Sequence, residues 1–198
     1  MRITFLLICL SCIATAATAQ SPATLEATIA AMWAKAPEDF RGRVVQDQTQ
    51  SLCTLTRNVP SAADFDAIVA RERLTIVFPA DGEVMGSWKQ GEIIAQSGAG
   101  GQFSDNAAIV HGGNCYACHQ IDAKELSYGT LGPSLRGYGR SRSFEPLAAK
   151  AVFAKIFNAQ SVQACSSMPR FGSSHFLTEQ QIKDVTAYLM DPASPVNN

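Results

Sequence analysis

Two cysteines and an adjacent histidine are the residues whose spacing carries the clearest chemistry in this chain. Cys115, Cys118 and His119 follow one another in the order Cys-x-x-Cys-His. Two thiols at this spacing can form thioethers with the two vinyl groups of one porphyrin, and the next histidine then lies beneath the iron. The motif therefore predicts one covalently bound haem c, with His119 as its proximal iron ligand.

The same cysteines allow two other readings. A thioredoxin-like dithiol requires a strand before the motif and a helix after it, and no such pattern surrounds these residues. A zinc site requires a second pair of ligands at close spacing. The remaining candidates, Cys53, Cys165, His111 and His175, are scattered along the chain.

The sixth ligand of a haem iron comes from histidine, methionine, cysteine or water. Met168 is the best candidate, because it precedes Pro169 in a loop between two predicted helices, well after the haem motif. His111 and His175 are the alternatives. Thioether ligation raises the reduction potential relative to two histidines, which suits an electron acceptor.

The amino terminus predicts export. Arg2 is followed by an apolar stretch from Ile3 to Ile13, and Ala17-Thr18-Ala19 places small residues where a signal peptidase reads them. Cleavage is expected after Ala19, with the mature protein in the periplasm. The alternative of a lipoprotein signal at Cys9 or Cys12 lacks the usual small residues before the cysteine. No later segment is long and apolar enough to cross a membrane.

Removal of such a signal leaves Cys53 and Cys165 outside the haem motif. An oxidising compartment favours a disulfide between them, and by the chain-entropy model a loop of this length contributes at most ~4–5 kcal/mol. Two buried free thiols are the alternative.

The hydrophobic pattern predicts an all-α protein. We expect a signal peptide over 1–19, a helical N-terminal extension over 20–83 and a haem domain over 84–198. The expected helices cover 24–36, 43–55, 88–96, 145–159 and 178–190, and a further helix begins after Ser61 and includes Phe65, Ile68 and Val69. Residues 74–78 are either an extended segment or the end of that helix. Ser61 and Thr178 are expected N-caps, and Asp191-Pro192 ends the last helix.

Further residues have candidate roles beside the haem. A carbonyl of Gly132-Pro133 is placed to accept the free N–H of His119. Gly91 and Tyr188 lie on the first and last helices of the haem domain, where a glycine permits a close crossing. The candidates for pairing with haem propionates or an acidic partner are Arg136, Arg140, Arg142 and Arg170, although solvated surface arginines are equally compatible.

Together these segments resemble the class I cytochromes c and, more narrowly, the monohaem X subunits of the sulfur-oxidising SoxAX cytochromes. The resemblance is firm over residues 84 to about 195 and weaker over 20–83. Its carrying segments are Gly113-Asn114-Cys115-Tyr116-Ala117-Cys118-His119, Gly129-Thr130-Leu131-Gly132-Pro133-Ser134-Leu135, Met168-Pro169-Arg170-Phe171-Gly172 and Leu177-Thr178 to Leu189.

The resemblance implies a heterodimer with a SoxA-type haem subunit. That complex joins thiosulfate to a cysteine of the carrier SoxYZ, the reaction of an L-cysteine S-thiosulfotransferase. The sulfur chemistry is expected on the partner subunit. The X subunit accepts the released electrons and passes them to a soluble cytochrome c. Carried over by motif, Cys115 and Cys118 hold haem, and His119 and Met168 bind iron.

Other functions remain open from the sequence. A free-standing electron carrier needs no extension over 20–83, and a haem catalyst such as a peroxidase or a gas sensor needs an open sixth position. The formal net charge of -1, without a basic block, argues against nucleic acid as a partner.

Overall fold

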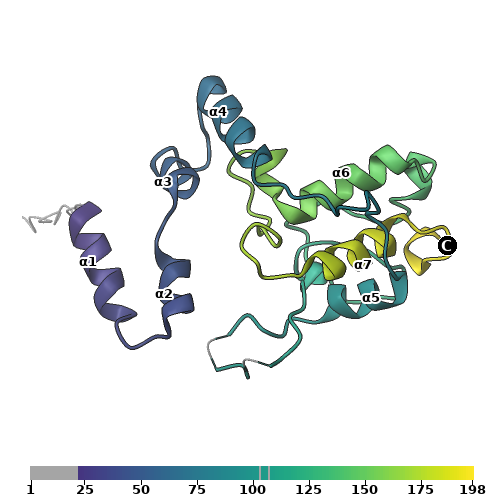
Figure 1. Cartoon of the computed structure of the whole chain (residues 1–198), viewed down its shortest axis with the longest axis horizontal. Coiled ribbons are helices and arrows are strands. Elements are labelled where there is room, and N and C mark those ends of the chain that lie inside the picture. Colours follow the sequence, from purple (N-terminus) through teal and green to yellow (C-terminus); the bar gives the residue numbers. More distant parts are fainter. Residues whose placement is uncertain (1–21, 103, 107) are drawn as a thin grey trace, which may run out of the picture. The chain divides into compact units, whose positions relative to one another are not determined.

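The computed structural model describes residues 22–102, 104–106 and 108–198, and every regular element within them is helical (Figure 1). The all-α prediction is confirmed. The expected signal peptide, with Cys9 and Cys12, lies outside the described residues. The chain divides between Val44 and Val45 into two compact units.

The first unit contains two short helices. They are α1 (Pro22–Met32) and α2 (Glu38–Val44). The helix predicted over 24–36 corresponds to α1, which ends earlier than expected. In α2, Arg41 forms an ion pair with Glu38 one turn before it.

The prediction of a single helix over 43–55 is wrong. The chain leaves the helical conformation after α2, and α3 (Gln48–Leu55) begins with Asp47 as its N-cap. The Asp47 carboxylate accepts the backbone N–H of Gln50, and the Gln50 side chain accepts the N–H of Asp47. This capping box satisfies free donors at the start of α3, which makes a new helix more favourable than a continuous one.

The first of the two expected N-caps is confirmed. Ser61 is the N-cap of α4 (Ala62–Arg73) and accepts the backbone N–H of Asp64. After α4 the chain is non-helical until α5. Ile68 and Val69 of α4 are buried beside Cys53 and Ala164 in a small cluster of their own. Residues 45–83 thus belong to the same compact unit as the rest of the chain, and the division expected near residue 84 lies inside this unit.

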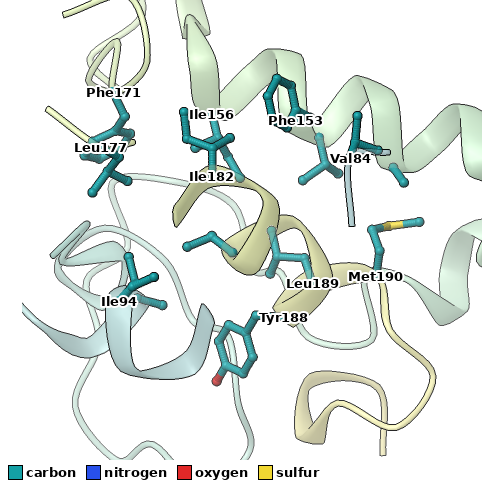
Figure 2. Close-up of a cluster of buried hydrophobic side chains, with 14 of the residues drawn as sticks. Val84, Ile94, Phe153, Ile156, Phe171, Leu177, Ile182, Tyr188, Leu189 and Met190 are labelled. Carbon is teal, nitrogen blue, oxygen red and sulfur yellow. The ribbon is translucent and has the colours of Figure 1, made fainter. Parts of the chain in front are cut away.

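The main core lies between three helices. These are α5 (Trp88–Gln96), α6 (Pro146–Phe157) and α7 (Glu179–Met190). Figure 2 shows Ile182, Tyr188 and Leu189 of α7 at the centre of the cluster, with Ile94 of α5 on one side and Phe153 of α6 on another. Thr178 caps α7 in a capping box with Gln181, as predicted.

Helices α5 and α7 cross at a glycine. A Cβ atom added to Gly91 would lie 2.0 Å from the carbonyl oxygen of Asp184 and 2.8 Å from the Cβ of Tyr188. Only a residue without a side chain permits this approach, so the predicted close crossing is confirmed. The crossing positions the C-terminal end of α5, from which the chain runs towards the cysteine motif.

Candidate haem site

The cysteine motif forms a tight turn attached to the end of α5. Gly113 donates its N–H to the carbonyl of Ile94 (2.8 Å), and Asn114 donates to Ser97 (2.8 Å). A 3-10 turn then covers Cys115–Ala117. The carbonyl of Cys115 accepts the N–H groups of both Cys118 and His119. The two thiols and the imidazole therefore project from one short turn. A thioredoxin-like dithiol would instead lie at a strand–helix junction.

Neither motif cysteine is in a disulfide. Burial raises the pKa of the Cys115 thiol from its ordinary value of 9.0 to about 12. Reactive dithiols have thiol pKa values that are lowered by nearby positive charge or a helix N-terminus. The raised pKa of the Cys115 thiol is the opposite of what a redox-active dithiol requires.

The imidazole of His119 has a defined orientation. Its Nδ1 lies 2.7 Å from the carbonyl oxygen of Pro133. Since a carbonyl only accepts hydrogen bonds, Nδ1 carries the proton, and Nε2 keeps its lone pair. A Cβ on Gly132 would lie 2.2 Å from the Cε1 of His119, so the backbone passes directly against the ring. The carbonyl contact predicted from the sequence is confirmed, and it leaves Nε2 free to bind iron.

Met168 lies in the loop between α6 and α7. Its side chain is partly buried and packs against the main core, which Cys115 also borders. The histidine alternatives are placed differently. His175 is exposed, whereas His111 bonds to the carbonyl of Phe176 through Nδ1 (2.8 Å), and the edge of its ring packs closely against Gly100. The Nδ1 contact of His111 is of the same kind as that of His119, so it does not exclude His111, and Met168 as the sixth ligand stays a prediction.

The donor set fits haem c on these observations. It comprises two unbridged thiols, an imidazole with a free and oriented Nε2, and a partly buried thioether. Comparison with known proteins agrees. Residues 102–191 match the family model for cytochrome c. An uncharacterized lipoprotein of Aquifex aeolicus (strain VF5) is 35% identical over 171 residues, covering 82% of this chain and 78% of that protein.

Residues 102–191 are a cytochrome c domain. Domains of this family carry covalently bound haem c, and in this cytochrome Cys115 and Cys118 are the residues that would form the thioethers. Bound haem supplies a one-electron couple at its iron. Among the described residues of the cytochrome, no helix combines the length and the hydropathy needed to cross a bilayer.

A hydrogen bond between two tyrosines joins the motif to α7. The hydroxyl of Tyr116 lies 2.7 Å from that of Tyr188 and also accepts the backbone N–H of Asp122. Burial raises the pKa of both phenols above the ordinary value of 10. The sequence pattern predicts the role of Tyr188 at the helix crossing but not that of Tyr116. Its place at a variable position of the motif is a weak signal, because any residue can occupy that position.

The four candidate arginines have different surroundings. Arg136 and Arg140 line a pocket of about 380 Å³ together with Gln120 and Ser134. The guanidinium of Arg142 lies over the ring of Tyr138 at 3.5 Å. Arg170 forms ion pairs with Asp47 and Glu72. Pairing with haem propionates therefore stays a prediction for Arg136 and Arg140, and Arg170 is the least available of the four.

The structure joins the two cysteines outside the motif. Cys53 of α3 and Cys165 form a disulfide, with their Cα atoms 5.4 Å apart. Beside it lies a buried polar network that the sequence pattern does not predict. Its centre is the carboxylate of Glu72, which is only 4% exposed. No sequence signal marks this residue, because a glutamate in the last turn of an amphipathic helix usually faces water.

Proposed function

We propose that this cytochrome is a monohaem electron-transfer protein, with Cys115 and Cys118 as thioether anchors and His119 and Met168 as axial iron ligands. The observation that carries the proposal is the bond from the Nδ1 of His119 to the Pro133 carbonyl. It fixes the ring in the tautomer that coordinates iron through Nε2. A filled sixth position favours electron transfer over a peroxidase or a gas sensor.

The absorption spectrum of the ferric protein tests this assignment. Methionine coordination gives a weak charge-transfer band at the red edge of the visible spectrum, and we expect the wild-type protein to show it. Met168→Ala should keep the haem attached, remove this band and lower the reduction potential, because the thioether that stabilises ferrous iron is lost. A high-spin ferric wild type, or an unchanged potential in Met168→Ala, would refute the assignment.

We further propose that the cytochrome is the electron-accepting subunit of a SoxAX-type complex in the periplasm. Support comes from the Met168–Gly172 and Gly129–Leu135 segments and from the relative in Aquifex aeolicus, whose name is that of a lipoprotein, a class of exported protein. Coupling a carrier thiol to thiosulfate forms one S–S bond and releases one proton and two electrons. A single haem accepts these electrons one at a time and passes each to a soluble cytochrome c.

A free-standing electron carrier is the second candidate. An extension over 20–83 that served as a partner interface would argue against it. In the structure, residues 45–83 instead belong to the compact unit that contains the motif, which weakens that objection. Affinity purification from native periplasm separates the two candidates. Co-purification of a second haem subunit in stoichiometric amount supports the complex. Purification of a monomeric haem protein that does not accumulate in cells grown on thiosulfate refutes it.

A further inference from the structure

The loop that carries Met168 is attached to α3 and α4 on both sides of the methionine. Three residues before it, Cys165 forms the disulfide to Cys53 of α3. Two residues after it, Arg170 reaches the carboxylates of Asp47 and Glu72. Asp47 caps α3 and Glu72 lies in α4, so both attachments lead to the segment of residues 47–73.

The first attachment holds a loop residue in an unusual conformation. Cys165 has a φ of 56°, a left-handed value that residues other than glycine rarely adopt. Its backbone N–H donates to the side chain of Gln160 at 2.9 Å. Such a conformation persists only where the surrounding contacts determine it. The disulfide to α3 and the bond to Gln160 are these contacts.

The second attachment involves a buried charge. The guanidinium of Arg170 lies 2.6 Å from the Oδ2 of Asp47 and 3.4 Å from the Oε2 of Glu72. The Glu72 carboxylate also accepts hydrogen bonds from the hydroxyl of Thr49 and, at 2.7 Å, from the amide of Asn158. A buried carboxylate is costly when it loses a partner. Release of Arg170 from this network is therefore unfavourable, and the loop is held close to α4.

We propose that α3 and α4 act as a brace for the axial-ligand loop, with Arg170, Glu72 and the Cys53–Cys165 disulfide as positioning groups for Met168. None of them touches the iron. They restrict movement of the methionine sulfur away from the iron. An external ligand must therefore displace the sulfur and also move a loop that is attached at two points. This inference rests on the proposed function, since it takes Met168 to be the sixth ligand.

Competition with imidazole tests the brace. The ferric holoprotein is titrated with imidazole at neutral pH, and loss of the methionine band gives the apparent Kd. We expect Arg170→Gln and the double variant Cys53→Ser/Cys165→Ser each to bind imidazole about tenfold more tightly than the wild type, equivalent to about 1.4 kcal/mol. The matched control is Arg41→Gln, which removes an arginine ion pair in the other unit.

A second readout separates positioning from general destabilisation. Amide hydrogen exchange is followed in the same variants over residues 163–172 and over α7. The brace predicts faster exchange in the loop, with exchange in α7 unchanged in Arg170→Gln. If the disulfide variant does not fold, Arg170→Gln decides.

The outcomes are distinguishable. A wild-type protein without the methionine band overturns the ligand assignment and the brace together. A wild type with the band, but variants whose imidazole Kd stays within about twofold, overturns the brace alone. An increase in exchange of equal size in the loop and in α7 overturns it as well, because the contacts would then act only on global stability.

Discussion

The hydroxyl groups of Tyr116 and Tyr188 lie 2.7 Å apart in the core and join the haem motif to the C-terminal helix. Tyr116 is 6% exposed and Tyr188 is fully buried. With the N–H of Asp122 as a further donor, the pair satisfies hydroxyl groups that have no access to water. The hydrogen bond thus fixes the motif relative to α7 as well as to α5.

Tyr188→Phe should lower the free energy of unfolding by about 1 kcal/mol, because it removes one buried hydrogen bond and leaves the Tyr116 hydroxyl with one partner fewer. Guanidinium unfolding followed by circular dichroism measures the effect. The control is Tyr128→Phe, which removes a more exposed hydroxyl bonded to Gln120. Equal losses in the two variants would contradict the role given to the buried pair.

Gly91→Ala should destabilise the compact unit by roughly 2–3 kcal/mol or more, because the new methyl group would overlap the backbone of α7 at Asp184. Thermal unfolding measures the loss. Gly42→Ala is the matched control, since Gly42 is also helical but has no atom within 4 Å of an added Cβ. A Gly91→Ala protein as stable as the wild type would show that α5 and α7 do not pack so closely.

Gly132→Ala should disturb the proximal side of the haem. The added methyl group would lie 2.2 Å from the His119 ring. Displacing the ring should lower the free energy of unfolding by about 1–3 kcal/mol. We expect a larger high-spin fraction in the ferric spectrum, with the haem still covalently attached. Gly101→Ala, whose Cβ would meet only one atom at 3.9 Å, should leave the spectrum unchanged. An unaltered spectrum in both variants would contradict the close contact.

Asp47 should make stability depend on pH. Partial burial acts to raise the pKa of its carboxyl, but the Gln50 N–H and Arg170 outweigh it and lower the pKa below 3.8. A lowered pKa in the folded state means that the ionised carboxylate stabilises the fold above the ordinary pKa and that this contribution is lost as the pH falls through the lowered value.

Asp47→Asn retains a capping side chain but removes the charge. At pH 7 we expect its free energy of unfolding to be lower than that of the wild type by up to about 1 kcal/mol, as for a partly exposed ion pair. Urea unfolding at several pH values should show this difference shrinking below pH 3.8. Asp66→Asn, on the exposed face of α4, is the control. A difference that persists at low pH would point to lost capping instead of a lost ion pair.

Local signals in the sequence were sufficient for much of the fold. Ser61 and Thr178 cap helices where the pattern predicts them, since an N-cap depends on residues only three positions apart. The apolar spacing of residues 43–55 does not reveal the N-cap at Asp47, because this spacing also fits a continuous helix, and only the capping box of Asp47 with Gln50 starts a new one.

The sequence by itself determined the chemistry of the haem site, because the spacing of Cys115, Cys118 and His119 is a local property of the chain. Only the tertiary structure decided what surrounds it. Glu72 and Arg170 are 98 residues apart, and Tyr116 and Tyr188 are 72 apart. Such pairs depend on how the helices pack against one another. This packing produces no periodic pattern in the sequence of either segment. For this reason the attachment of the Met168 loop to α3 and α4 is visible only in the tertiary structure, and no sequence motif predicts it.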